Sequence, residues 1–317
     1  MIINRTNMDS LFQTFNTKFN EAQKHARERA FPNDLLLDEI ALALPVTGAA
    51  TVHPWIEQIR GIREWIGDRL ISNLKLGKLT VTNRDFENTV AVPANDIEDD
   101  QYGVFAPLIG MMGADAQTLW IKLAVDALLG NGAWADGNPF FCASRVLGDS
   151  TITNAVTAAL SQAAVEAGIA AMRGWTLNGG EPAEVAPRYL VCGPTLEATA
   201  KAICEAEIVA NTEGTAGVSN VSPARALKVR VSNRIVGTHA NKWFITGVKG
   251  GLPPVVVQQR KLPILTRKDR PEDDNVFNQN QFLYGVHARG ESFLSLPFLA
   301  YAGGMGEVAA YDAGLAV

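Results

Sequence analysis

The sequence predicts an α+β fold, arranged as two domains or as one domain with insertions. Its 317 residues exceed the roughly 100–200 residues of a single domain. The residues are 47% hydrophobic and 19% charged, which provides a core and excludes a disordered or collagen-like chain. The apolar pattern predicts roughly four helices and about eight or more strands that do not alternate one by one, which favours α+β.

Charge, apolar runs and cysteines exclude several classes of protein. The net charge of −5 lacks the basic excess of proteins built to grip nucleic acid. The first residues are polar, and no apolar run reaches the roughly 18–20 residues that cross a bilayer, so we expect neither a secretory signal nor a membrane partner. Cys142, Cys192 and Cys204 are odd in number and widely spaced, which predicts buried, inert thiols and folding in a reducing cytoplasm.

Residues 6–28 carry apolar side chains at helical spacing, including Phe15 and Phe19, with polar residues between them. This pattern predicts an amphipathic helix, which residues 31–34 (FPND) separate from the rest of the chain. Such a helix is either an ordinary core helix, which is the default, or an arm that packs on a neighbouring chain.

Residues 55–92 combine aromatic, branched and charged side chains, with a β-like pattern over residues 74–92. Residues 82–85 (TNRD) predict a turn at the centre of the β-like part. The segment holds six basic and five acidic residues, so a hairpin of this length cannot bury both faces in its own fold. We expect it to project into solvent or to lie on a partner.

The remaining residues predict further helices and strands. Residues 113–129 form a regular apolar stripe that ends at residues 130–132 (GNG), and an acidic helix start follows Pro93. An alanine-rich helix is expected over residues 151–173, capped by Asp149 or Ser150. A helix from Pro194 to about residue 210 is followed by a small-residue loop, 211–224. Strands are expected over residues 188–193, 229–236, 243–246, 254–259, 280–286 and 293–296.

No segment predicts a catalytic, cofactor-binding or metal-binding site. Residues 77–80 (GKLT) end like a phosphate loop, but Ser72 replaces the first glycine. Residues 96–100 (DIEDD) begin like a calcium loop, but Gln101 replaces the required glycine. The histidines stand far apart, and none has an i, i+4 partner. They are His25, His53, His239 and His287. With a projecting hairpin and a separate N-terminal helix, this favours an assembling structural protein over an enzyme.

Four segments carry a resemblance to a known family. They are REWIGDR (63–69), FENTVAVPANDIEDDQYGVFAPLIGMMG (86–113), ADGNPFF (135–141) and RPEDDNVFNQNQFLYGVHAR (270–289). In order and spacing they resemble the major head subunit of Mu-like phages, which has the Hong Kong 97-type capsid fold. The likeness is weakest over about 145–250, and residues 142–145 (CASR) stand where family members often carry a histidine.

The resemblance implies four parts. Residues 1–50 would form an N-terminal arm that reaches a neighbouring subunit, and residues 51–95 an E-loop hairpin lying across the adjacent subunit. Residues 96–149 and 254–317 would form a peripheral domain, with a spine helix at about 113–129. Residues 150–253 would form an axial domain, whose loop 211–224 meets its copies at the centres of pentamers and hexamers.

The resemblance also implies the function of a major capsid protein, which forms an icosahedral shell around double-stranded DNA. It would be found in the virion and, during assembly, in the host cytoplasm. Implied partners are further copies of the chain, a scaffolding protein, a portal and a head maturation protease, with a decoration protein as an optional partner and no cofactor. Two alternatives stay open. An encapsulin-like compartment would have a cargo gene as neighbour, and an α+β enzyme with a scattered site would be a small oligomer with a deep pocket.

Overall fold

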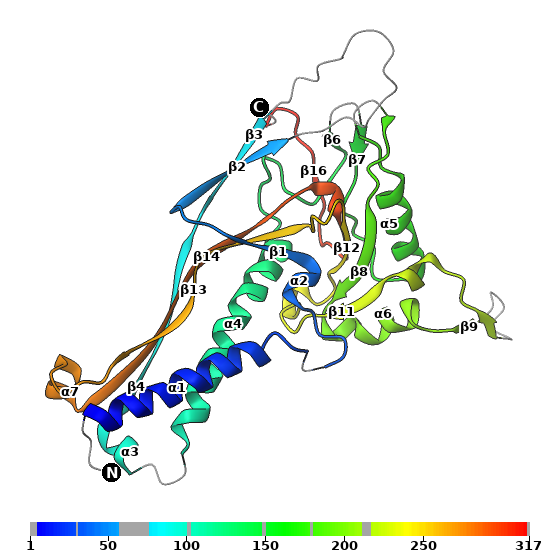
Figure 1. The fold of residues 1–317 in the computed structure, drawn as a ribbon. Helices are drawn as coiled ribbons and strands as arrows, with labels where there is room; N and C mark the ends of the chain where they lie inside the picture. The colour runs from blue at the N-terminus through cyan, green and yellow to red at the C-terminus, as the bar shows by residue number, and fades with distance from the viewer. Residues whose placement is uncertain are drawn as a thin grey trace.

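A computed structural model describes residues 5–29, 31–56, 76–99, 103–147, 150–177, 180–210 and 217–315. They form an elongated part, built on a long twisted sheet, and a compact part, built on a second sheet (Figure 1). Helix α4 (Phe105–Gly130) belongs to both parts. Its first half contributes Ile109 to the core of the elongated part, and its second half contributes Trp120 to the larger core of the compact part.

The long sheet has the strand order β1-β13-β14-β4. β13 (Val255–Lys268) and β14 (Gln281–Leu294) form the central antiparallel hairpin. β4 (Arg84–Pro93) pairs antiparallel with β14, and β1 (Ala41–Pro45) pairs parallel with β13. Alternate side chains of β14 are buried and half exposed, so one face of this sheet covers a core.

Helices α1 (Arg5–His25) and α4 cover the buried face of the long sheet (Figure 1). The rings of Phe15 in α1 and Tyr284 in β14 meet edge to face, with their centroids 5.2 Å apart. Gly113 lets the two helices approach closely, because a Cβ at this position would overlap the carbonyl oxygen of Phe19. The amphipathic helix predicted over residues 6–28 is confirmed, although it ends at His25.

The compact part is built on a sheet of order β11-β8-β12-β15. β8 (Ala186–Cys192) and β12 (Trp243–Val248) are its inner strands, flanked by β11 (Lys228–Val231) and β15 (Ala300–Gly303). Helices α5 (Gln162–Gly174) and α6 (Glu197–Cys204) pack on it. The first five residues of β12 are all buried, as expected for a strand covered on both faces.

Shorter elements lie outside the two four-stranded sheets. The helical ones are α2 (Leu37–Ile40), α3 (Ala94–Glu98), α7 (Asp274–Gln279) and 3-10 turns at Pro194–Leu196, Pro223–Ala226, Gly237–His239 and Pro297–Leu299. The strand pairs are β2 (Ala50–Ile56) with β3 (Leu76–Thr82), β5 (Cys142–Ala143) with β16 (Ala309–Ala310), β6 (Arg145–Leu147) with β7 (Ser150–Ile152), and β9 (Ile208–Ala210) with β10 (Gly217–Ser219).

Residues 31–45 connect the two sheets. Asp34 forms a parallel bridge with Val231 at the end of β11, and the backbone N–H of Leu35 donates to the oxygen of Val231 at 2.9 Å. Ten residues further on, the same segment ends as β1 at the edge of the long sheet.

Glu39 anchors this connection with a carboxylate that is only 8% exposed. It accepts a hydrogen bond from Arg230 Nε of β11 at 2.6 Å and another from the backbone N–H of Leu36 at 3.0 Å. It also pairs with Arg29, which follows α1. One buried carboxylate therefore joins three parts of the chain.

Several predicted helix boundaries are wrong. The helix expected over residues 113–129 begins eight residues earlier, at Phe105. Its Pro107 lies in the first turn, where a missing N–H removes no helical hydrogen bond. The helix expected over residues 151–173 begins only at Gln162, after a Ser161 cap, and Ser150 instead starts β7. The helix expected to reach about residue 210 ends at Cys204.

The predicted strands differ mainly in length. β13 spans 14 residues, where the sequence predicted one short strand. β14 also spans 14 residues, where the sequence predicted two short strands. The strand expected over residues 229–236 ends at Val231. The turn expected at residues 82–85 is wrong, because β3 and β4 follow each other with only Asn83 between them. The partner strand changes there from β2 to β14.

Candidate interaction surfaces

Arg267 of β13 holds α1 on the long sheet of its own chain. Its guanidinium lies over the ring of Phe12, 4.4 Å from the ring centroid, which is a cation–π contact. It also donates to the backbone oxygen of Met8 at 3.1 Å and pairs with Asp9. In this structure α1 is thus a core helix, and its contact with a neighbouring subunit stays a prediction.

Asp269 is buried beside this contact and is 1% exposed. Its Oδ2 accepts a hydrogen bond from the Tyr284 hydroxyl at 3.4 Å, and its Oδ1 lies 3.5 Å from Arg267 Nε. Burial raises the pKa of Asp269 above its ordinary value, although Arg267 and Tyr284 oppose the shift. Burial also raises the pKa of Tyr284. The folded chain therefore disfavours the charged form of Asp269.

β2 and β3 form a projecting antiparallel ribbon, paired from Ala50 with Thr82 to Ile56 with Leu76. The segment that joins them, residues 57–75, lies outside the described residues. Asn83 fixes the base of the ribbon, since its side-chain amide donates to the oxygens of Gly48 at 3.0 Å and Ala49 at 3.3 Å. Only the first part of the predicted hairpin projects, because β4 belongs to the long sheet.

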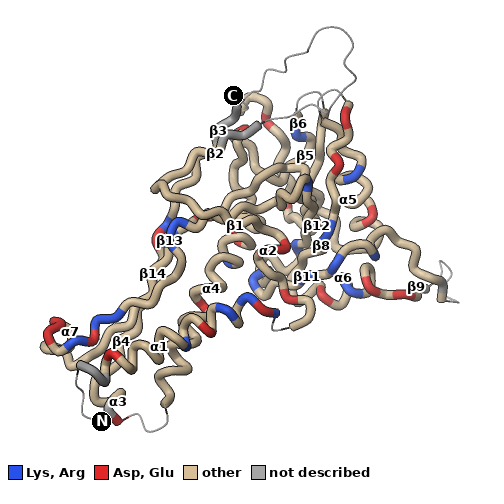
Figure 2. The backbone as a smooth tube through the Cα atoms, viewed as in Figure 1, with Lys and Arg blue, Asp and Glu red and all other residues tan. Residues whose placement is uncertain are grey.

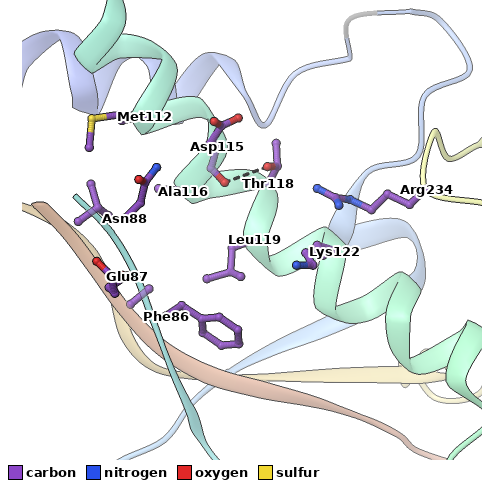
Figure 3. A pocket seen from close by; sticks show the side chains of 12 residues that line it. Phe86, Glu87, Asn88, Met112, Asp115, Ala116, Thr118, Leu119, Lys122 and Arg234 are labelled. Carbon is purple, nitrogen blue, oxygen red and sulfur yellow. Dashed lines mark hydrogen bonds between the residues drawn. The ribbon is translucent and has the colours of Figure 1, made fainter. Parts of the chain in front are cut away.

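A groove of about 360 Å³ lies between α4 and the long sheet (Figure 3). Its apolar lining includes Phe86 of β4 and Leu119 of α4. Lys122 and Arg234 lie together at one end (Figure 3). The acidic residues of the lining are Glu87, at the other end, and Asp115 of α4. Both cations are exposed, and neither has an ion-pair partner within the described ranges. The groove therefore offers an apolar surface with positive charge at one end.

Large apolar side chains are exposed at both ends of the molecule. Phe277 of α7, at the tip of the long sheet, is 84% exposed. At the far end of the compact part, Ile208 of β9 is exposed just before the predicted small-residue loop, 211–224. Val221, within that loop, is also exposed, and residues 211–216 lie outside the described residues. Figure 2 shows acidic residues gathered at α7 and basic residues along the neighbouring strands. These side chains are candidate contact points between copies of the chain.

Arg145 organises the loop that contains the ADGNPFF segment, and its side chain is fully buried. It pairs with Asp136, donates to the oxygen of Pro139 and lies over the ring of Trp134, 5.1 Å from the centroid. It belongs to residues 142–145, where the sequence departs from the family pattern. This role could not be predicted from the sequence, because a single arginine there gives no sign of burial.

The described residues bring together no group of three His, Cys, Asp or Glu side chains that could hold a metal ion. All three cysteines are buried, as predicted. Burial raises the pKa of both Cys192 and Cys204 to about 12, and it also raises the pKa of Cys142. In the part of the chain that the structure covers, no helix is long and apolar enough to span a membrane.

A known protein family matches most of this chain. The family described as "Phage capsid protein" matches residues 85–290, nearly two thirds of the chain. The chain belongs to the phage capsid protein family. The family "Mu-like prophage major head subunit gpT" matches residues 8–157 of this capsid protein, which confirms the predicted resemblance.

Two curated relatives align with about four fifths of the chain. The capsid protein is 25% identical over 255 residues to the Mu-like prophage FluMu major head subunit of Haemophilus influenzae, covering 79% of the chain and 60% of the relative. It is 21% identical over 256 residues to the major capsid protein of Escherichia phage Mu, covering 80% and 61%. The chain thus spans about three fifths of the length of these curated relatives. Both names describe head or capsid subunits, and neither describes an enzyme.

A solved structure shows the fold. A chain in the procapsid of bacteriophage JBD30 matches with a TM-score of 0.54 at 22% identity, covering 98% of this chain and 78% of that one. The capsid protein therefore has the predicted α+β fold of the Hong Kong 97 type.

Proposed function

We propose that this capsid protein is the major head subunit of a Mu-like tailed phage or prophage. Its copies assemble into hexamers and pentamers of an icosahedral shell, and it has no catalytic role. The observation that carries the proposal is the family match over residues 85–290, on a chain with the fold of a procapsid subunit over nearly its whole length.

The architecture supports this function. A helix of 26 residues packs on a sheet whose two central strands have 14 residues each, which makes a stiff elongated part. Apolar side chains are exposed at both ends of the molecule. Contacts between copies can be individually weak, since closed rings repeat each contact many times.

The proposed division follows the four implied parts. Residues 1–50 form the N-terminal arm and residues 51–95 the E-loop, whose β2–β3 ribbon crosses the adjacent subunit while β4 stays in the long sheet of its own chain. Residues 96–149 and 254–317 form the peripheral domain, and residues 150–253 form the axial domain, with the loop 211–224 at ring centres. β15 lies in the range assigned to the peripheral domain but pairs with β12 in the sheet of the axial segment, so the two parts share that sheet.

The shell encloses double-stranded DNA and assembles in the host cytoplasm with a scaffolding protein, a portal and a head maturation protease; a decoration protein is optional. The net charge of −5 supports a container that does not hold its contents tightly, because basic patches bind DNA by releasing counterions. Tight binding of duplex DNA by purified shells at physiological salt would contradict this part.

Negative-stain electron microscopy and sedimentation of the purified protein, with and without its candidate scaffold, test the function. Rings, tubes or closed shells are expected. Particles that hold a cargo enzyme instead of DNA when isolated from the host would favour the encapsulin-like alternative. A monomer or dimer under every condition would contradict the proposal and favour the enzyme alternative.

A further inference from the structure

Helix α7 presents an aromatic side chain and a carboxylate on one exposed face. Phe277 is 84% exposed, although large aromatic side chains are usually buried. Asp274 is also exposed and lies three residues earlier, so the two side chains share a helix face. Glu272 adds a second exposed carboxylate just before the helix.

The rest of α7 is tightly held, so this face is presented in a fixed orientation. The side-chain amide of Asn275 donates to the backbone oxygens of Lys268 at 2.9 Å and Gln281 at 2.6 Å, which joins the ends of β13 and β14. Val276 packs against the core of the elongated part. Because the helix is already ordered, docking Phe277 would cost little conformational entropy.

The groove between α4 and the long sheet has the complementary features. Its volume of about 360 Å³ exceeds the ~150 Å³ of a cavity that holds a benzene ring. The apolar side chains of Phe86 and Leu119 would contact an inserted ring, and the exposed cations Lys122 and Arg234 lie at one end (Figure 3). These cations suit the carboxylates that precede Phe277.

A chain cannot fill its own groove with its own α7. The groove is lined by Val286 and Ala288, whereas α7 leads into β14 at Gln281. Five strand residues at about 3.4 Å each place Val286 roughly 17 Å from that end of the strand. An α7 that occupies the groove must therefore come from another copy.

We propose that α7 of one subunit docks in the α4–sheet groove of a second copy, with the Phe277 ring in the apolar part and Asp274 facing Lys122 and Arg234. This inference rests on the proposed self-assembly and names one of its contacts. The contact joins two different surfaces, so each subunit donates one α7 and accepts another, and the arrangement can close into a ring.

Cross-linking between two single-cysteine variants tests the contact directly. D274C and K122C subunits are assembled together and oxidised mildly, with the native cysteines buried. A covalent dimer in the mixture, and none in either variant alone, is the expected result. Dimers in D274C alone would show that α7 meets α7, and no dimer in assembled mixtures would show that α7 lies elsewhere. Either result overturns the proposal.

The subunit concentration needed for assembly, compared between F277A and F31A, tests how much Phe277 contributes to the contact. F31A is the matched control, because Phe31 lies elsewhere and is also largely exposed, at 72%. Loss of an anchoring ring should raise the subunit concentration needed for assembly about tenfold or more in F277A, and little in F31A. K122E should weaken assembly, and D274K should restore it in the double variant.

Normal assembly of F277A would overturn this contact and leave the proposed function intact. Failure of the wild-type chain to assemble at all would overturn both.

Discussion

Replacing Glu39 by glutamine should destabilise the chain by about 3 kcal/mol. The change keeps the side-chain volume but removes a buried charge that pairs with Arg230, which is 11% exposed, and with Arg29, which is 30% exposed. Breaking a buried pair costs about 3–5 kcal/mol, because the partner charge is left uncompensated. The partial exposure of Arg29 places the expected value at the lower end of that range.

Urea unfolding of the unassembled subunit, followed by circular dichroism, measures this loss. At a slope of about 3 kcal/mol per molar urea, the midpoint should fall by roughly 1 M. Glu197→Gln is the matched control, since Glu197 forms a partly exposed pair with Lys201 on α6 and its loss should matter little. Equal midpoints for the two variants would refute the claim that Glu39 joins the two sheets.

Three further predictions concern α1, its buried neighbour and the thiols. Gly113→Val should displace α1 and expose it to protease, because the new side chain would overlap the backbone of Phe19. The raised folded-state pKa of Asp269 means that the unfolded chain binds fewer protons, so stability should fall as pH rises through that pKa. D269N should remove this dependence and raise the melting temperature near neutral pH. Cys192 and Cys204, whose pKa values are about 12, should not react with a thiol reagent at pH 8 until the chain unfolds.

Each of these predictions has a control or a contradicting result. Gly130→Ala adds a methyl group where nothing lies within 4 Å, so equal protease sensitivity in the two glycine variants would contradict the first. A D269N chain that melts below the wild type at neutral pH would show that the Arg267 pairing outweighs the cost of burial. Rapid labelling of native Cys192 or Cys204 would show that the thiols are accessible.

Helical periodicity predicted α1 and most of α4 because their core-facing side chains recur every three or four residues. It failed at residues 151–161, where alanine and threonine fit an extended chain as well as a helix. Tertiary partners decide the conformation there: Ala155 bridges to Ala302, and the backbone N–H of Val156 donates to the oxygen of Ala302 at 2.9 Å. No local pattern carries that information.

Strand lengths were underestimated because one face of the long sheet is exposed. In the sequence of β13, the charged residues after Gln259 and the proline at 263 indicate the end of a strand. The structure accommodates Pro263 at a shift in register between Lys261 and Ile264, and the charged side chains lie in water. Likewise, Asn83 is a residue type that favours turns, but here its side-chain amide donates a hydrogen bond to the backbone oxygen of Gly48.

The interaction surfaces could be predicted only in part. The mixed charge of the hairpin was visible in the sequence. The groove was not, because its lining comes from β4, α4, Arg234 and β14, which only the fold brings together. The buried roles of Arg145 and Glu39 also depend on partners that are invisible without the fold.

Cryo-electron microscopy of particles assembled from the purified protein, with the proposed scaffolding protein, tests the central claim most directly. The account predicts rings of five and six copies in a closed shell, with the β9–β10 ends at the ring centres and the β2–β3 ribbons lying on adjacent subunits. Particles without this arrangement, or a chain that stays monomeric or dimeric with scaffold present, would contradict it.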